Sequence, residues 1–172
     1  MRPENVVEFM HDVPASFKAL FAFYKQIGAL AVFIRFRPEG MTIFARDHRG
    51  YLRTVVKVEG KPLVHYYYGG PAEGLWVRIA LSSPIQKNFA SINKDYHMIS
   101  LTVQHDTPTT LSIGYHGSLK QITVNAIECS SEQPDALLLE AEMHLDPAEV
   151  VVSYPVSFVL PAAKFKQLVS TA

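Results

Sequence analysis

The stretch from Val32 to Gly60, VFIRFRPEGMTIFARDHRGYLRTVVKVEG, decides how the chain folds. Its first run alternates between two faces, and two further runs rich in β-branched and aromatic residues follow. Pro38 and Gly40 separate the first two runs, and Gly50 separates the second from the third. A period of two, interrupted by Pro and Gly, is typical of strands joined by tight turns. The stretch therefore predicts an antiparallel meander of strands at Val32–Phe36, Met41–Phe44 and Leu52–Val58.

The overall composition is that of an ordinary globular protein. The 172 residues are 48% hydrophobic, so we expect one main domain with a sizeable core. Sixteen Lys and Arg balance sixteen Asp and Glu, so any attraction to nucleic acid must come from a local arrangement of charge. The single cysteine, Cys129, cannot form a disulfide within the chain. With no apolar run of membrane-helix length and no signal-peptide core, we expect a soluble, intracellular protein without membrane contact.

A strand and a helix precede the meander. The strand is expected at Val6–Met10, and the helix at Ser16–Ile27 with Gly28 as its cap. The polar side of this helix carries a narrow stripe of Lys18, Ala22 and Lys25. Its apolar side is defined by residues at helical spacing, which are Phe17, Leu20, Phe21, Tyr24 and Ile27.

A second round of the same elements follows. Leu63–Tyr68 and Leu75–Ile79 are expected to form a strand or a hairpin, interrupted at Gly69–Pro71. A helix is expected at Pro84–Asn93, because a serine followed by proline is a helix-start signal. Its polar face repeats the Lys, small, Lys stripe of the first helix with Lys87, Ser91 and Lys94. Three strands are then expected at Met98–Val103, Thr110–Gly114 and Gln121–Asn125.

A third round begins near the C-terminus and contains one strand and one helix. Residues 129–135 are expected to form a linker, and 136–143 fit a strand or a helical turn equally well. A strand is expected at Tyr154–Leu160, followed by a helix at Pro161–Ser170. That helix carries Lys164 and Lys166, and its inward residues are expected to be Phe165, Leu168 and Val169.

This doubled strand–helix–three-strand pattern resembles one domain of PCNA, the replication sliding clamp, and is closest to the PCNA-like clamps of large DNA viruses. The matching stretches span nearly the whole chain and are Glu8–Phe9, Phe17–Phe21, Gly40–Asp47, Gly60–Tyr67, Gln121–Val124 and Tyr154–Phe158. The resemblance implies an α+β DNA-clamp fold, a doubled βαβββ unit with two antiparallel sheets outside and two helices inside. It also implies that the meander arginines Arg35, Arg37, Arg49 and Arg53 belong to the outer sheets or their turns.

The resemblance divides the chain into three parts. Residues 1–128 correspond to a clamp domain, 129–153 to a connector, and 154–172 to the opening strand and helix of a second domain. Because three two-domain subunits close a PCNA ring, we expect a monomer or weak oligomer here rather than a stable trimer. The family binds client peptides between the connector and the turn after the third strand. Here that turn, Arg46–Tyr51, is charged and the second domain's wall is missing, which leaves client-peptide binding open.

The function implied by the resemblance is that of a DNA sliding clamp. It would serve as a DNA polymerase processivity factor in viral DNA replication, in the host-cell nucleus or a viral replication compartment. Double-stranded DNA would be held without sequence specificity, and a DNA polymerase would be a further partner. Taken singly, lysines on helices are most often just solvated, so phosphate contact is favoured only together with the resemblance. The residues expected to contact DNA are Lys18, Lys25, Lys87, Lys94, Lys164 and Lys166.

Two functions other than DNA clamping have features in the sequence to consider. The first is an interaction module that keeps the clamp fold and recruits a partner at an exposed strand edge without binding DNA. The second is an enzyme or metalloprotein, which we do not expect. Seven histidines lack metal-ligand spacing, so no metal or cofactor is expected, and no Gly-x-Ser-x-Gly turn is present. The aromatic residues Tyr66–Tyr68 and Trp76 could stack on bases, but strand aromatics more often pack in the core.

Overall fold

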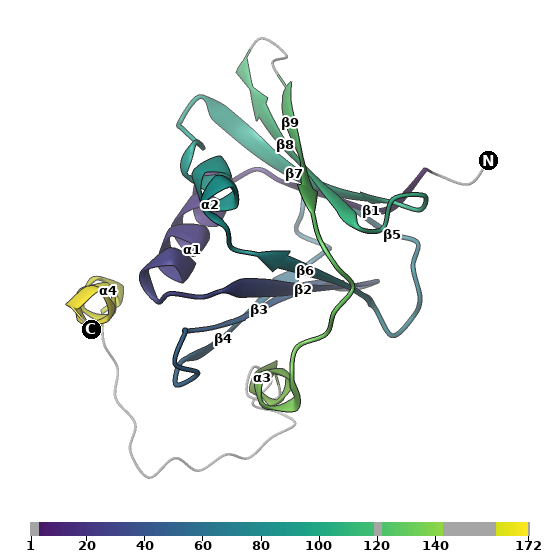
Figure 1. Ribbon diagram of the computed structural model, residues 1–172. Coiled ribbons are helices and arrows are strands. Elements are labelled where there is room, and N and C mark those ends of the chain that lie inside the picture. The colour runs from purple at the N-terminus through teal and green to yellow at the C-terminus, as the bar shows by residue number, and fades with distance from the viewer. Residues whose placement is uncertain (1–3, 119–121, 143–160, 172) are drawn as a thin grey trace.

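The computed structural model describes residues 4–118, 122–142 and 161–171, whose arrangement is shown in Figure 1. These residues form nine strands and four helices. The first elements are β1 (Asn5–His11), α1 (Pro14–Gln26), β2 (Ala31–Arg37), β3 (Gly40–Arg46), β4 (Arg53–Glu59) and β5 (His65–Tyr68). The later elements are β6 (Leu75–Ala80), α2 (Ser83–Ala90), β7 (Tyr96–Gln104), β8 (Thr110–Gly117), β9 (Ile122–Glu128), α3 (Ala136–Glu140) and α4 (Ala162–Thr171).

Two antiparallel sheets form the body of the protein. Their strand orders are β5-β1-β7-β8-β9 and β4-β3-β2-β6. Each half of the chain completes the sheet of the other half, because β1 pairs with β7 and β2 pairs with β6. Helices α1 and α2 lie together on one side of the two sheets (Figure 1). This arrangement confirms the predicted α+β clamp fold, with paired helices on one side and two antiparallel sheets on the other.

The segment before α2 does not form the hairpin that was one of the two predictions for it. Strand β5 pairs with β1, where Tyr66 lies opposite Phe9, whereas β6 pairs with β2 in the other sheet. Residues 69–74 therefore carry the chain from one sheet to the other. Gly74 has a φ of 109°, and a Cβ there would lie 3.0 Å from the carbonyl oxygen of Phe36, so the crossover needs glycine. Periodicity identifies both strands but contains no information about their partners.

The two helices pack against each other through an aromatic stack. The rings of Phe21 in α1 and Phe89 in α2 have centroids 3.6 Å apart and an angle of 6° between their planes, and both side chains are buried. Tyr115 of β8 donates a hydrogen bond to the carbonyl oxygen of Asn88 at 3.3 Å, which ties α2 to the five-stranded sheet. Of the five residues predicted for the apolar side of the first helix, Phe17, Phe21, Tyr24 and Ile27 are buried and Leu20 is partly buried.

Helix α2 ends at Ala90, three residues before the predicted end at Asn93. The hydroxyl of Ser91 donates to a backbone carbonyl of the last turn at 2.6 Å, and the side chain of Asn93 accepts from the backbone N–H of Asp95 at 2.8 Å. Short polar side chains that bond to nearby backbone compete with the helical hydrogen bonds. Lys94, which was expected on the polar face of this helix, therefore lies in the turn before β7.

The segment after β9 contains a short helix rather than a strand. Residues 136–140 form α3, and the carboxylate of Asp135 accepts from the backbone N–H of Leu138 at 2.9 Å. This hydrogen bond is an N-cap, which satisfies one of the free N–H groups in the first turn. In an apolar run as short as residues 136–140, strand alternation and helical spacing cannot be told apart. Asp135 is a typical N-cap residue, however, and its position indicates that a helix starts there.

The C-terminal helix is present as predicted, at Ala162–Thr171. Phe165, expected to face inward, is 41% exposed, and its ring lies 6.3 Å from that of Phe23 in α1. This contact places α4 beside α1. The expected strand at 154–160 lies outside the described residues, as do the side chains of Leu168 and Val169.

Candidate nucleic-acid interface

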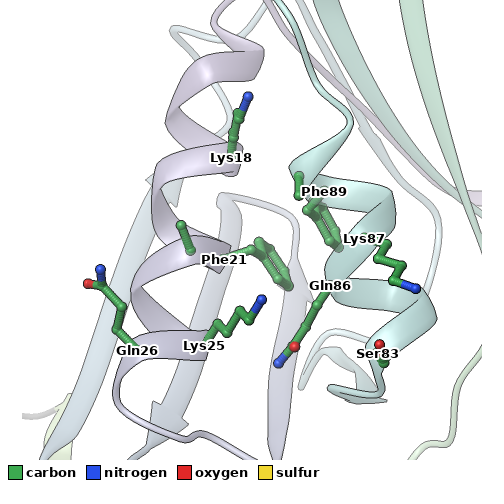
Figure 2. A pocket seen from close by; sticks show the side chains of 10 residues that line it. Lys18, Phe21, Lys25, Gln26, Ser83, Gln86, Lys87 and Phe89 are labelled. Atoms are coloured by element: carbon green, nitrogen blue, oxygen red, sulfur yellow. The ribbon is translucent and has the colours of Figure 1, made fainter. Parts of the chain in front are cut away.

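Helices α1 and α2 enclose a groove of about 320 Å³ on their exposed side (Figure 2). The stacked rings of Phe21 and Phe89 form the floor of the groove. The short side chains of Ala22 and Ala90 also line it and do not fill the space between the longer polar side chains. Polar side chains stand along its rims, but most of its lining surface is apolar. Its lining residues from α1 include Lys18, Ala22, Lys25 and Gln26, and those from α2 include Ser83, Gln86, Lys87 and Ala90.

The helices that carry the predicted site are free of negative charge. The sequences of α1, α2 and α4 are PASFKALFAFYKQ, SPIQKNFA and AAKFKQLVST, which contain lysine but neither aspartate nor glutamate. The whole chain has sixteen acidic residues, so their absence from all three helices is a feature of this side of the protein. A surface with cations alone has a positive local potential even though the formal net charge is zero.

Lys18 has a structural role that its spacing did not predict. Its Nζ donates a hydrogen bond to the carbonyl oxygen of Ile92 at 2.7 Å, and therefore joins α1 to the end of α2. Its ammonium group still adds positive charge to the groove. However, one of its three N–H donors is engaged with the protein, so Lys18 is less available for phosphate than a free lysine.

Lys25 and Lys87 are two further exposed cations of the groove. Lys25 extends from α1 toward α2 and ends near Gln86, whereas Lys87 points away from α1 (Figure 2). Neither side chain forms an ion pair or hydrogen bond with another described residue. Their ammonium groups are therefore free to contact an external anion.

The remaining predicted lysines lie at the edges of this helix surface. Lys94 is exposed in the turn that follows α2 and has an acidic neighbour, Asp95. Lys164 and Lys166 are exposed on α4, which contacts α1 through the aromatic pair described above. We call Lys25, Lys87, Lys164 and Lys166 the lysine set, because these four are exposed, belong to helices and have no structural hydrogen bond with a described residue.

A second concentration of cations lies on the outer face of the four-stranded sheet, where Arg35, Arg37 and Arg53 were expected to belong to the outer sheets or their turns. Strand neighbours alternate between faces, and directly paired residues share one. The observed register therefore places five arginines together on the side opposite the core, which we call the arginine face: Arg35, Arg37, Arg46, Arg53 and Arg78. Four of them pair with carboxylates of residues 132–142: Arg35 and Arg37 with Glu142, Arg46 with Asp135, and Arg78 with Glu132.

The arginine face differs from the lysine set in that its charge is already engaged. The Arg37 pair has an N···O distance of 3.0 Å and the Arg78 pair one of 3.4 Å. Arg35 donates to the carbonyl oxygen of Glu73 and lies over the ring of Trp76, 5.3 Å from its centroid. Alternation along β2 was a signal for this face, but carboxylate partners 89 and 105 residues away could not be predicted from the sequence.

The neighbours Asp47 and His48, in the charged turn after β3, both bond to the backbone. The carboxylate of Asp47 accepts from the backbone N–H of Leu52 at 2.8 Å, and this hydrogen bond lowers the pKa of Asp47. The ring of His48 instead lies 3.3 Å from the carbonyl oxygen of Ile27. Within the described part of the chain, no three metal-ligating side chains gather. Among the same residues, no helix combines the length and apolar character needed to cross a membrane.

The fold just described recurs in PCNA structures. PCNA from Thermococcus kodakaraensis matches with a TM-score of 0.64 and 13% identity, over 87% of this chain and 52% of that one. The PCNA2–PCNA3 complex from Sulfolobus tokodaii matches with a TM-score of 0.57 and 10% identity, over 77% and 50% of the two chains. At such low identity the match concerns the fold alone. This chain has the sliding-clamp fold, and it corresponds to about half of each PCNA chain.

Relatives by sequence are viral proteins. Uncharacterized proteins of African swine fever virus, from isolates in Kenya and Namibia, are 26% identical over 171 residues, which is 99% of this chain. The chain spans about half the length, 55%, of the curated relatives it matches. No family model matches the chain.

Proposed function

We propose that this protein holds duplex DNA as a sliding clamp and serves as a processivity factor for a DNA polymerase in viral replication. One observation carries the proposal: α1, α2 and α4 contain five lysines and no carboxylate, in a chain with a formal net charge of zero. The PCNA-like fold and the viral relatives support it.

The lysines of the helix surface are suited to DNA contacts that hold the duplex and still allow it to slide. Lysine presents a compact, strongly hydrated charge on a flexible stem, so it neutralises phosphate without fixing one geometry. Phosphate contacts position a protein on the duplex but read no sequence. Ala22 and Ala90 have short side chains, so the lysine side chains extend beyond the surface between them and their ammonium groups are accessible to a duplex. We propose that binding is weak per subunit, independent of sequence and strongly dependent on salt.

The remaining parts of the proposal follow from the same comparison. We propose a non-catalytic role without a cofactor, in the host-cell nucleus or a viral replication compartment. The polymerase is the protein partner that a processivity factor requires. For this chain by itself we propose a monomer or weak oligomer.

A second candidate function is an interaction module without DNA binding. It is favoured by β9, which lies at the edge of the five-stranded sheet and exposes Ile122 and Val124 by 58% and 61%. An edge strand with unpaired backbone groups and exposed apolar side chains is a template for strand addition by a partner. The balanced net charge also favours this candidate.

A salt titration separates the two functions. Two labelled duplexes of unrelated sequence, each of about 30 base pairs, are titrated with the protein at salt concentrations from about 0.05 to 0.2 M. The clamp proposal predicts equal affinity for both duplexes, because the contacts are made to phosphate. It also predicts a slope of log affinity against log salt between about −3 and −5, since each phosphate contact contributes about −0.9. Absence of binding at the lowest salt would instead support the interaction module.

A further inference from the structure

Ser83 lies beside the lysines of the groove between α1 and α2. It is the first residue of α2 and lines the groove together with Lys25 and Lys87. Ser83 and Lys87 are four residues apart on one helix, so they are neighbours on its surface, with Cβ atoms about 5 to 6 Å apart. Figure 2 shows the two side chains on the same side of α2. A change of charge at Ser83 therefore acts most strongly on Lys87.

The hydroxyl of Ser83 is exposed and has no structural role. Within the described residues it forms no hydrogen bond, and no side chain caps the first turn of α2. The hydroxyls of Ser91 and Ser170, by contrast, donate to backbone carbonyls at 2.6 and 2.9 Å. The ends of helices also open locally at little cost in free energy. Ser83 is therefore accessible to an enzyme that modifies hydroxyl groups.

The residue after Ser83 is Pro84, and a serine followed by proline is the acceptor pattern of proline-directed protein kinases. Proline has a fixed φ and no N–H group, so a kinase pocket without a backbone acceptor at this position selects it over other residues. The chain has one further pair of this kind, Thr107–Pro108, in the turn between β7 and β8. Thr107 is exposed and belongs to neither helix of the groove, so it provides an internal comparison.

We propose that Ser83 is a phosphorylation site and that a phosphate there weakens the grip of the helices on DNA. The inference rests on the proposed DNA binding of the lysine set. A proline-directed kinase supplies the phosphoryl group from a nucleoside triphosphate. The Oγ of Ser83 forms a bond to the γ-phosphorus, and the bond from that phosphorus to the bridging oxygen breaks. The hydroxyl proton passes to a base of the kinase, and the nucleoside diphosphate leaves.

The added charge is comparable to the whole charge of the groove. Lys18, Lys25 and Lys87 contribute three positive charges, and a phosphoserine carries about −1.5 to −2 at pH 7. The described residues of α1, α2 and α4 include no aspartate or glutamate, so the phosphate is the first negative group on these helices. It cancels about half or more of the groove charge, pairs with Lys87 and repels the phosphates of a duplex.

The modification is compatible with the fold. The first turn of α2 has no side-chain cap, and a negative group near the start of a helix is stabilising. Phosphorylation should therefore leave the thermal unfolding midpoint unchanged or raise it. This measurement distinguishes a loss of DNA affinity caused by charge from a loss caused by unfolding.

The test treats the protein with ATP and two proline-directed kinases, one mitogen-activated and one cyclin-dependent, and locates each phosphate by mass spectrometry. Affinity for a labelled duplex is measured before and after treatment. Phosphorylation of Ser83 should lower the affinity at least about tenfold at about 0.1 M salt, because the contact of Lys87 is lost. The slope of log affinity against log salt should become less steep by about 0.9. A Ser83→Ala variant, still phosphorylated at Thr107, should keep the affinity that it had before treatment.

Absence of phosphate from Ser83, whether or not Thr107 is modified, would overturn the proposal. So would complete phosphorylation of Ser83 with unchanged affinity, or a loss of affinity accompanied by a lower unfolding midpoint. An equal loss in the treated Ser83→Ala variant would assign the effect to Thr107 and also overturn it. If the untreated protein does not bind the duplex, the proposed function and this inference both fail, and that result is seen before any kinase is added. Binding by the untreated protein that Ser83 phosphorylation leaves unchanged overturns this inference alone.

Discussion

Replacing the lysine set, Lys25, Lys87, Lys164 and Lys166, by glutamate should lower the affinity for duplex DNA at least about four thousandfold at about 0.1 M salt. Each lost phosphate contact removes about 0.9 from the steepness of the salt dependence, which is close to a tenfold loss of affinity per contact at this salt. Fluorescence anisotropy with a labelled duplex, repeated at several salt concentrations, measures both quantities. Lys18 is left unchanged because its hydrogen bond to Ile92 joins the two helices.

A matched control reverses exposed cations on the sheet side, in Lys57→Glu/Lys61→Glu. Lys57 lies on β4 and Lys61 in the turn after it, away from the helices, so their reversal should change the affinity by less than about threefold. Arg35, Arg37 and Arg53 are unsuitable controls, because they hold the polypeptide at Glu73, Glu142 and Leu137. A large loss in the sheet-side variant, with none in the lysine variant, would place the DNA on the opposite side of the protein.

Substitution of Phe89 by alanine should have the largest effect on stability, about 3 to 5 kcal/mol in the free energy of unfolding. The ring is 2% exposed and stacks on Phe21, so its removal leaves a cavity between α1 and α2 and loses an aromatic pair. The floor of the groove would also collapse or loosen, so the cations on its two sides would no longer be held at a fixed spacing.

Urea unfolding followed by circular dichroism measures this loss. Leu30→Ala is the matched control, since Leu30 is exposed and its truncation should cost no more than about 0.5 kcal/mol. If Phe89→Ala cost as little as Leu30→Ala, the stack would not join the helices, and the groove would not be a rigid feature of the fold.

Local patterns in the sequence predicted most of the elements. The alternation of Val32, Ile34 and Phe36 and the helical spacing of Phe17, Phe21 and Tyr24 report directly which side chains are buried. Pairing between elements could not be predicted in this way. Strands β5 and β6 are close in sequence but belong to different sheets, because the choice of partner depends on contacts with β1 and β2.

The candidate site was predictable to a similar degree. Lysines on a helix opposite its apolar face are exposed almost by necessity, which is why Lys25 and Lys87 lie as expected. Lys18 differs because its partner is a carbonyl group 74 residues away, and Lys94 differs because Ser91 and Asn93 end the helix early. The arginine face depends on the register of four strands and on a segment that crosses them, which no local pattern encodes.

The most direct test of the proposed DNA face is the chemical reactivity of its amines in the unmodified protein. Lysines are acetylated with and without saturating duplex DNA, and each site is quantified by mass spectrometry. Bound DNA should protect Lys25 and Lys87 at least about threefold, because their ammonium groups contact phosphate, and should leave Lys57 and Lys61 unchanged. Protection of Lys57 and Lys61 with full reactivity at Lys25 and Lys87 would contradict the assignment of the helices as the DNA-binding side.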